Sequence, residues 1–329
     1  MIKRFWKKVS AICLAAVVSV SMIPISDVFA NEETPVFNEE NILTAELEEE
    51  EITSSVPLDN DALFEDYVEI KLEISSAPKT SSSRGSKLTG TNRNVYLKLK
   101  DEISKVADGE SDSTVFKVSV DELGLEKDYW TAADLGVSAI VENGSITDDA
   151  VDALMEELNL DLNKVVTALL ADCPYELYWY DKTSGVSMKG PGISASGNGK
   201  EWTIGFDGEI AFSFSVAQGY AAGEYTVDTT NAERVQNAVD NAQSIISDYR
   251  TVSDYEKLVG YKTEICDLVS YDHNAADDDS TPYGDPWQII SVFDGDTGTN
   301  VVCEGYAKSF QYLCDQTAFR RDITCILVT

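Results

Sequence analysis

The chain has 329 residues and a formal net charge of -33, with 58 acidic side chains against 25 basic ones. Nucleic acids and anionic membrane surfaces are bound through clustered Lys and Arg, so this balance argues against both as partners. The length is sufficient for one or two domains with substantial cores. The composition therefore predicts a soluble protein that repels polyanions, and it leaves the fold open.

Residues 1–30 have the pattern of a signal peptide. A basic start is followed by a mostly apolar run over residues 11–25, and Val28-Phe29-Ala30 supplies the small-residue end that signal peptidase reads. An uncleaved anchor is the less favoured alternative, because the apolar run is short and is interrupted by Pro24 and Asp27. We therefore predict a secreted or cell-surface protein that has no membrane attachment after cleavage.

Residues 31–91 are predicted to be a disordered or linker region. They are first acidic, with four glutamates at positions 48–51, and then rich in Ser and Thr. Such segments bury too little apolar surface to fold. Within them, residues 67–74 alternate between apolar and charged side chains and predict one short strand.

Residues 92–228 are predicted to form a small α+β domain. Apolar periodicity and turn signals indicate the following elements: a helix over 95–106, a strand over 114–120, helices over 148–158 and 162–170, a strand over 177–180, and a hairpin of 202–206 with 209–216 across Asp207-Gly208. The aromatic residues here could form a carbohydrate platform, but a stripe at strand period favours a core.

Residues 229–329 are predicted to form a second domain. Two helices should begin at capping boxes, Thr230 to Glu233 and Ser253 to Glu256. A polar loop beginning at Tyr271-Asp272 follows, and the last residues, 322–329, have the pattern of a strand.

Cys303 is the candidate nucleophile. A Gly- and Asp-rich loop over residues 294–300 leads to it, and apolar residues then recur at helical spacing from Tyr306. The cysteine therefore falls at or just before the first turn of a helix, where unpaired N–H groups and the helix dipole favour a thiolate. The alternative from the residues alone is an ordinary buried core cysteine.

Five cysteines follow the signal peptide, at positions 173, 266, 303, 314 and 325. An odd number in an exported chain leaves at least one thiol free or paired between molecules. This count suits a reactive Cys303, although all five could be reduced. The density is too low for a disulfide scaffold.

The order of these features resembles the first half of a transglutaminase-like domain of the exported bacterial type. The residues that carry the resemblance are Tyr271-Asp272, Cys303, Gly305-Tyr306-Ala307, Phe310 and the apolar run Ile323 to Val328. It covers roughly residues 230–329 and implies the N-terminal part of a papain-like, transglutaminase-like fold, preceded by the small α+β domain. It also implies a protein or peptide substrate, attack of the Cys303 thiolate on an amide carbonyl, a thioester intermediate, and no cofactor or metal.

In that family the catalytic His and Asp follow the cysteine on later strands, and this sequence has no counterpart for either. The single histidine, His273, precedes Cys303. It could approach the site in space, but a loop or helix-end histidine is favoured. We expect a C-terminally truncated chain; a natural loss that leaves a non-catalytic cell-surface or envelope binding module, and a secreted cysteine peptidase, are the alternatives. Enzymatic activity and oligomeric state are left open.

Two further groups of residues are candidate sites. The backbone N–H groups of Trp287 and Gln288 could complete an oxyanion hole, but a packed Trp287 and a solvated Gln288 are favoured. Asp294, Asp296 and Asn300 resemble part of a calcium loop. The glycine and the final acidic ligand of such a loop are misplaced, so a turn into the helix is favoured.

Overall fold

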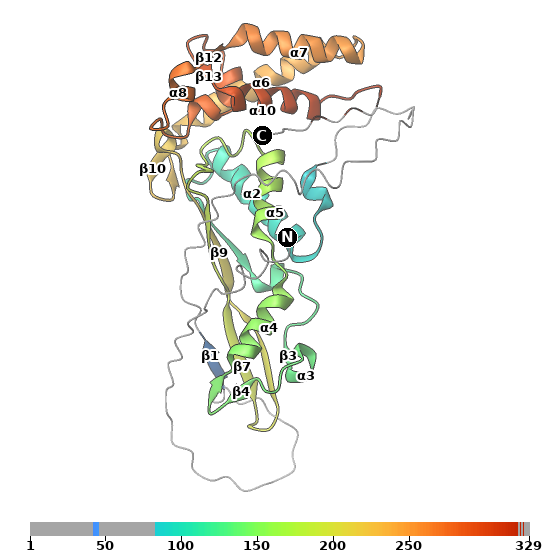
Figure 1. Cartoon of the computed structure of the whole chain (residues 1–329), viewed down its shortest axis with the longest axis vertical. Helices are drawn as coiled ribbons and strands as arrows, with labels where there is room; N and C mark the ends of the chain where they lie inside the picture. The colour runs from blue at the N-terminus through green and yellow to red at the C-terminus, as the bar shows by residue number, and fades with distance from the viewer. Residues whose placement is uncertain (1–41, 46–82, 322, 324, 326–329) are drawn as a thin grey trace, which may run out of the picture. The chain divides into compact units, whose positions relative to one another are not determined.

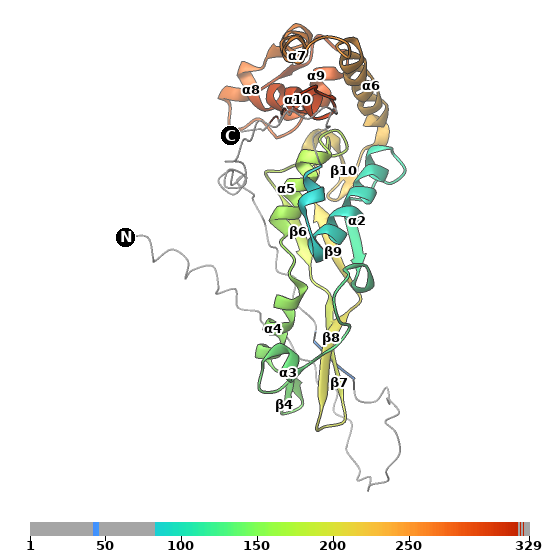
Figure 2. The same ribbon diagram turned by 90° about the vertical axis from the view of Figure 1, so that its right-hand side faces the viewer.

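A computed structural model describes residues 42–45, 83–321, 323 and 325 (Figures 1 and 2). The described chain is a mixture of helices and strands, which confirms the α+β class. It divides into two compact units. Unit 1 contains 42–45, Lys117–Leu160 and Met188–Ala211, and unit 2 contains 83–116, Asp161–Ser187, 212–321, 323 and 325. The signal peptide and the strands predicted over 67–74 and 322–329 fall largely or wholly outside the described residues, and the boundary at 228/229 stays a prediction.

Unit 1 is built on an antiparallel sheet with the order β1-β7-β8-β3. Its strands are β1 (Ile42–Ala45), β7 (Gly192–Gly197), β8 (Trp202–Asp207) and β3 (Trp130–Thr131). Helix α4 (Asp148–Leu158) packs against β8 through a face that includes Ala150 and Leu154. Strand β1 lies in the acidic segment that the sequence predicted to be disordered, and it pairs with β7. The prediction of disorder is therefore wrong for these four residues.

The hairpin predicted across Asp207-Gly208 is wrong. Strand β8 pairs instead with β7, around a turn in which the Asn198 side chain accepts the N–H groups of Lys200 and Glu201. Strand β9 (Glu209–Phe214) belongs to a second sheet with the order β2-β9-β6, formed with β2 (Val115–Ser119) and β6 (Val186–Lys189). Gly208, with φ of +75°, adopts the left-handed backbone of the bend between β8 and β9.

In unit 2, helices α2 (Gly90–Ala107) and α5 (Leu162–Asp172) lie side by side (Figures 1 and 2). Asp172, at the end of α5, accepts the backbone N–H groups of Arg84 and Gly85 at 2.8 Å and the Tyr96 hydroxyl at 2.7 Å. These bonds hold the short 3-10 helix η2 (Arg84–Lys87) against α5. The linker prediction is therefore wrong from residue 83 onward.

Asp172 gives unit 2 an acid-sensitive contact. Burial alone raises the pKa of its carboxyl, but hydrogen bonds from Gly85, Ser83, Arg84 and Tyr96 outweigh burial and hold the pKa below its ordinary value. A lowered folded-state pKa stabilises the fold above the unfolded pKa of about 3.9, and this contribution is lost as pH falls through the folded pKa. We expect the difference in free energy of unfolding between wild type and Asp172→Asn to shrink below about pH 4. Urea unfolding from pH 7 to pH 3 measures this difference. A difference that stays constant with pH would contradict this expectation.

The aromatic segment after α5 is core. Residues 177–180 are a run of tight turns rather than the predicted strand, with Leu177 N–H bonded to Cys173 and Tyr180 N–H bonded to Leu177. Trp179 is fully buried and packs edge-to-face against Phe116 and Phe214. Burial of these rings confirms the core interpretation over the exposed carbohydrate platform.

The C-terminal part of unit 2 is mainly helical. Its helices are α6 (Ala232–Asp248), α7 (Asp254–Leu268), α8 (His273–Asp277), α9 (Ile290–Phe293) and α10 (Cys303–Asp315). The capping box at Ser253 is confirmed. The one predicted at Thr230 is not formed, because Asp228 accepts both the N–H and the hydroxyl of Thr230 and begins a 3-10 turn, η5 (Thr229–Asn231).

The remaining elements are short. They are η3 (Val120–Glu122), α3 (Ala132–Leu135), β4 (Val141–Glu142), β5 (Ser145–Ile146), η4 (Gln218–Tyr220), β10 (Ala221–Gly223), β11 (Thr226–Val227), β12 (Ser270–Tyr271), η6 (Asp285–Trp287) and β13 (Asn300–Val301). Among the described residues, no helix is both long enough and apolar enough to cross a membrane.

Candidate active site around Cys303

Cys303 is the first residue of the 13-residue helix α10, as the sequence predicted, and its side chain is exposed. The preceding residue, Val302, has an extended backbone and supplies no side-chain cap. The N–H groups of a first helical turn have no intrahelical acceptors, and here no side chain of the N-cap residue takes them. The thiol therefore lies at the positive end of the α10 dipole.

A pair of short parallel strands places Cys303. Strands β12 and β13 pair with Ser270 opposite Asn300 and Tyr271 opposite Val301. The next N–H group, that of Asp272, donates to the Val301 carbonyl at 3.0 Å. Because parallel strands run in the same direction, helices α8 and α10 begin at the same end of this pair, where both strands finish.

His273 begins α8 at that end of the strand pair. Its exposed ring lies 5.0 Å from the ring of Tyr271, which stacks on Tyr306 at 6.3 Å, one turn beyond Cys303. Asp272 caps α8 by accepting the N–H of Ala275. The fold therefore brings His273 to the same end of the strand pair as Cys303, but in the described part of the chain no hydrogen bond joins the two residues.

Gly305 lets α10 sit close to β13. A Cβ atom added at this position would lie 2.7 Å from the Val301 Cβ, which is closer than real Cβ contacts come. The glycine of the Cys-x-Gly-Tyr-Ala sequence is therefore required by the packing of the helix on the strand that leads into it.

The 3-10 helix η6 supports the residue before Cys303. The Pro286 carbonyl accepts the Val302 N–H at 2.8 Å, while the N–H groups of Trp287 and Gln288 donate to Gly284 and Asp285. These two N–H groups are therefore already used, so the oxyanion-hole alternative finds no free donors there. Gln288 is 3% exposed, so the expectation of a solvated side chain is wrong.

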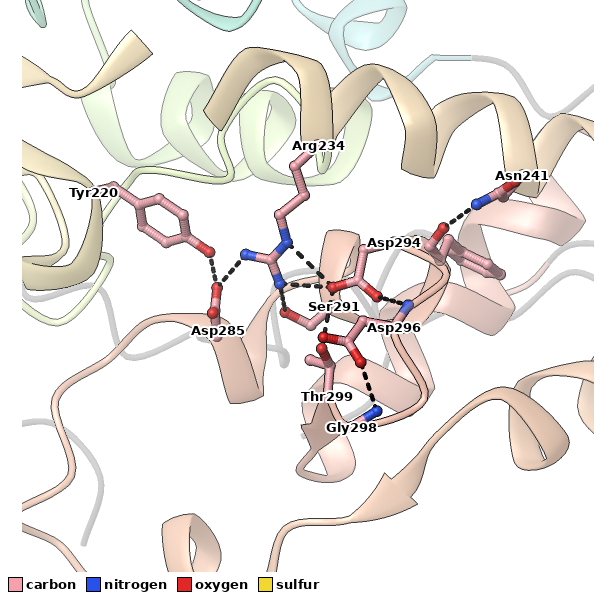
Figure 3. A network of polar contacts seen from close by, with 10 residues as sticks. Tyr220, Arg234, Asn241, Asp285, Ser291, Asp294, Asp296, Gly298 and Thr299 are labelled. Atoms are coloured by element: carbon pink, nitrogen blue, oxygen red, sulfur yellow. Dashed lines mark hydrogen bonds and ion pairs between the residues drawn. The ribbon is translucent and has the colours of Figure 1, made fainter. Parts of the chain in front are cut away.

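Arg234 of α6 binds both ends of the segment from Asp285, in η6, to Asp294, where the loop that approaches Cys303 begins (Figure 3). Its Nη1 donates to Asp285 at 3.0 Å, and its Nη2 donates to Asp294 at 2.8 Å and to Ser291 at 3.2 Å. The Tyr220 hydroxyl also donates to Asp285. One guanidinium thus fixes η6, α9 and the start of the approach loop together.

The approach loop is a series of tight turns. Asp294 accepts the Asp296 N–H at 2.9 Å and the Thr299 hydroxyl at 3.2 Å, and Asp296 accepts the Gly298 N–H at 2.8 Å (Figure 3). Both carboxylates accept hydrogen bonds within the loop, and that of Asp294 also binds Arg234. This is the arrangement of a turn into the helix.

Glu304, next to Cys303, is the centre of a half-buried charge cluster. It forms ion pairs with Lys182 and Lys308, each at 2.6 Å, and accepts the Tyr283 hydroxyl at 3.1 Å. Burial raises the pKa of the carboxyl, but the charges of Lys308 and Lys182 outweigh it and hold the pKa below its ordinary value. Desolvation lowers the pKa of Lys308 despite its ion pair.

A pocket of about 670 Å³ opens beside this cluster. Its lining includes Lys182, Glu304, Tyr283 and Trp287, and the rings of Tyr283 and Trp287 stack at 5.5 Å. The pocket is lined by both aromatic and charged groups, which is the composition of many small-ligand sites.

No protein-family model matches this chain, and no curated protein is significantly similar to it. The sequence predicted that a helix begins at Cys303, but it did not indicate Arg234 or the Glu304 cluster. The spacing of Glu304 and Lys308, four residues apart on a predicted helix, was a readable signal for that ion pair.

Proposed function

We propose that Cys303 is the nucleophile of a transglutaminase-like acyl-transfer site, on the N-terminal part of a papain-like fold. The observation that carries the proposal is an exposed thiol at the first turn of α10, held there by β13 and by the Pro286 carbonyl. Export of the protein, and a protein or peptide as its substrate, belong to the same proposal.

The chemistry would begin with attack of the Cys303 thiolate on the carbonyl carbon of an amide. The carbon–nitrogen bond breaks, the amine leaves with a proton, and a thioester forms. A second amine or water then attacks the thioester and returns the thiolate. The resemblance assigns proton transfer to a His and an Asp that follow the cysteine, so the described residues supply the nucleophile and its immediate support.

Thiol labelling tests the nucleophile, and Cys266 is the matched control. Both thiols are exposed, but Cys303 begins α10 whereas Cys266 lies in the last turn of α7, where the helix dipole has the opposite sign. We expect iodoacetamide to alkylate Cys303 at least about tenfold faster than Cys266 at pH 7. Peptide mapping gives both rates in one sample, and equal rates would contradict an activated Cys303.

Amine incorporation into a glutamine peptide, compared with peptide cleavage, separates the acyl acceptors. Activity that is lost in Cys303→Ser but kept in Cys266→Ser would assign the chemistry to Cys303. Comparing His273→Gln with wild type then measures whether this histidine takes part, since both residues lie at the same strand edge.

A non-catalytic binding module is the second candidate. The pocket beside Glu304 favours it, because aromatic and charged side chains already line the pocket without any contribution from the Cys303 thiol. Under this candidate Cys303 and Cys266 react at equal rates. Cys303→Ser would then leave ligand binding unchanged.

A further inference from the structure

The pocket beside Glu304 has an aromatic wall that is held in place by its neighbours. The ring of Tyr283 is 9% exposed and stacks on the indole of Trp287 at 5.5 Å, with 29° between the two planes. The Tyr283 hydroxyl donates to Glu304 at 3.1 Å, and the backbone N–H of Trp287 donates to the Gly284 carbonyl at 2.9 Å. Trp287 is half-buried and lines the pocket, so a fixed indole is offered to a ligand there.

Some polar groups of the lining already have partners within the protein. The Asp181 carboxylate accepts the backbone N–H of Thr183 at 2.9 Å and its hydroxyl at 2.5 Å. The Lys182 ammonium donates to Glu304 at 2.6 Å and lies 5.4 Å from the centre of the Tyr283 ring. These groups shape the pocket and leave the recognition of a ligand mainly to the rest of the lining.

Four other side chains of the lining keep hydrogen-bonding groups for a ligand. Within the described part of the chain, no hydrogen bond is formed by the side chains of Gln218, Asp279, Thr281 and Trp287. The carboxylate accepts, the indole N–H donates, and the amide and the hydroxyl do both. A matching ligand therefore presents several donors and acceptors close to one another.

The charge of the lining disfavours an anionic ligand. Glu304 is shared by the ammonium groups of Lys182 and Lys308, so this cluster carries one net positive charge. Asp181 and Asp279 add two negative charges to the lining, which makes the whole group negative by one. Because Lys182 also opposes a cation, the pocket suits an uncharged ligand.

The backbone of the lining favours a sugar over an extended peptide. Residues 182–184 and 279–281 lie in turns and bends, and Gln218 and Trp287 lie in 3-10 helices. A peptide that adds a strand needs an exposed sheet edge, which these residues do not supply. A sugar ring needs only an aromatic face for its C–H groups and partners for hydroxyls that both donate and accept.

We propose that the pocket beside Glu304 binds an uncharged carbohydrate. One sugar ring stacks on Trp287, and its hydroxyl groups bond to Gln218, Asp279 and Thr281. The volume of about 670 Å³ lies within the range of small-ligand sites. The proposal names a ligand class for the binding-module candidate, and it does not depend on acyl transfer by Cys303.

A glycan array probed with the full chain tests the ligand class. We expect binding to uncharged oligosaccharides, and titration calorimetry with the best of them then gives the Kd. Binding only to sialylated or sulfated glycans, or to no glycan, would overturn the proposal. A peptide array probed in parallel would overturn it if the chain bound peptides and no uncharged glycan.

Two pairs of variants test the site itself. Trp287→Ala should weaken binding of that oligosaccharide by about fivefold or more, whereas Trp202→Ala, at a half-buried tryptophan of β8 in unit 1, should leave the Kd unchanged. Asp279→Ala changes an exposed side chain and should weaken binding by about fivefold, whereas Asp277→Ala, at an exposed position of α8, should not. An unchanged Kd in both Trp287→Ala and Asp279→Ala would overturn the proposal.

The carbohydrate site and the nucleophile are tested by separate readouts. The Kd of the oligosaccharide reports on the pocket, and the alkylation rate of Cys303 reports on the thiol. Failure of sugar binding with fast alkylation of Cys303 would overturn the carbohydrate proposal alone. Sugar binding with equal rates at Cys303 and Cys266 would support the binding-module candidate.

Discussion

Replacing Arg234 by methionine is expected to lower the free energy of unfolding by about 3–5 kcal/mol, because it leaves a buried carboxylate without its counter-charge. The side chain of Asp294 is 4% exposed and accepts two hydrogen bonds from the guanidinium. Methionine keeps the apolar stem of the arginine and removes only the charge. Chemical denaturation of wild type and variant measures the difference.

A double-mutant cycle isolates the Arg234–Asp294 contact. Asp294→Asn removes the unpaired charge, so we expect Arg234→Met and Asp294→Asn to be non-additive by about 1–3 kcal/mol. Arg250, an exposed arginine just beyond α6, provides the control, and Arg250→Met should change stability by less than about 0.5 kcal/mol. Additive effects at 234 and 294 would show that the Arg234–Asp294 contact drawn in Figure 3 does not stabilise the fold.

Arg234→Met should also slow the alkylation of Cys303. Arg234 fixes Asp285 at the start of η6, and the neighbouring Pro286 carbonyl holds the Val302 N–H directly before Cys303. Without the guanidinium, η6 and the approach loop lose their common anchor. We expect the Cys303 rate to fall toward that of Cys266 under conditions where the variant is still folded. An unchanged ratio would restrict Arg234 to a purely structural role.

The helices whose caps are local in sequence were predicted well. Asp161 accepts the Lys164 N–H, and Ser253 and Glu256 form the expected box, because each cap depends on residues three positions apart. The box predicted at Thr230 does not form for an equally local reason, since Asp228, two residues earlier, accepts the Thr230 N–H that Glu233 would have accepted. The strand predicted over 177–180 is wrong because a short apolar run fits a buried turn as well as a strand.

The site was predictable only in part. The start of α10 at Cys303 follows from apolar spacing, a local property of the chain. Arg234 is 51 residues from Asp285 and 60 from Asp294, and Lys182 is 122 from Glu304. No periodicity links residues at such separations, so these partners required the three-dimensional structure.

Gly305→Ala is expected to destabilise the protein by about 1–3 kcal/mol, although alanine is normally the better helix former by up to about 1 kcal/mol. The sign depends on the contact with β13, because the added methyl would meet the Val301 Cβ at 2.7 Å and its two Cγ atoms at 3.1 and 3.2 Å. Gly219→Ala is the matched control, since an added Cβ there meets nothing within 4 Å. Denaturation curves of the two variants separate the contact from the general effect of adding a methyl group.

The Gly305 variant also links packing to the thiol. Val301 pairs with Tyr271 and its carbonyl accepts the Asp272 N–H, so a helix pushed away from β13 carries Cys303 away from the strand edge where His273 begins α8. We expect slower alkylation of Cys303 in Gly305→Ala and an unchanged rate at Cys266. A variant as stable and as reactive as wild type would show that α10 can shift without cost. The glycine would then have no packing role in the Cys-x-Gly-Tyr-Ala sequence.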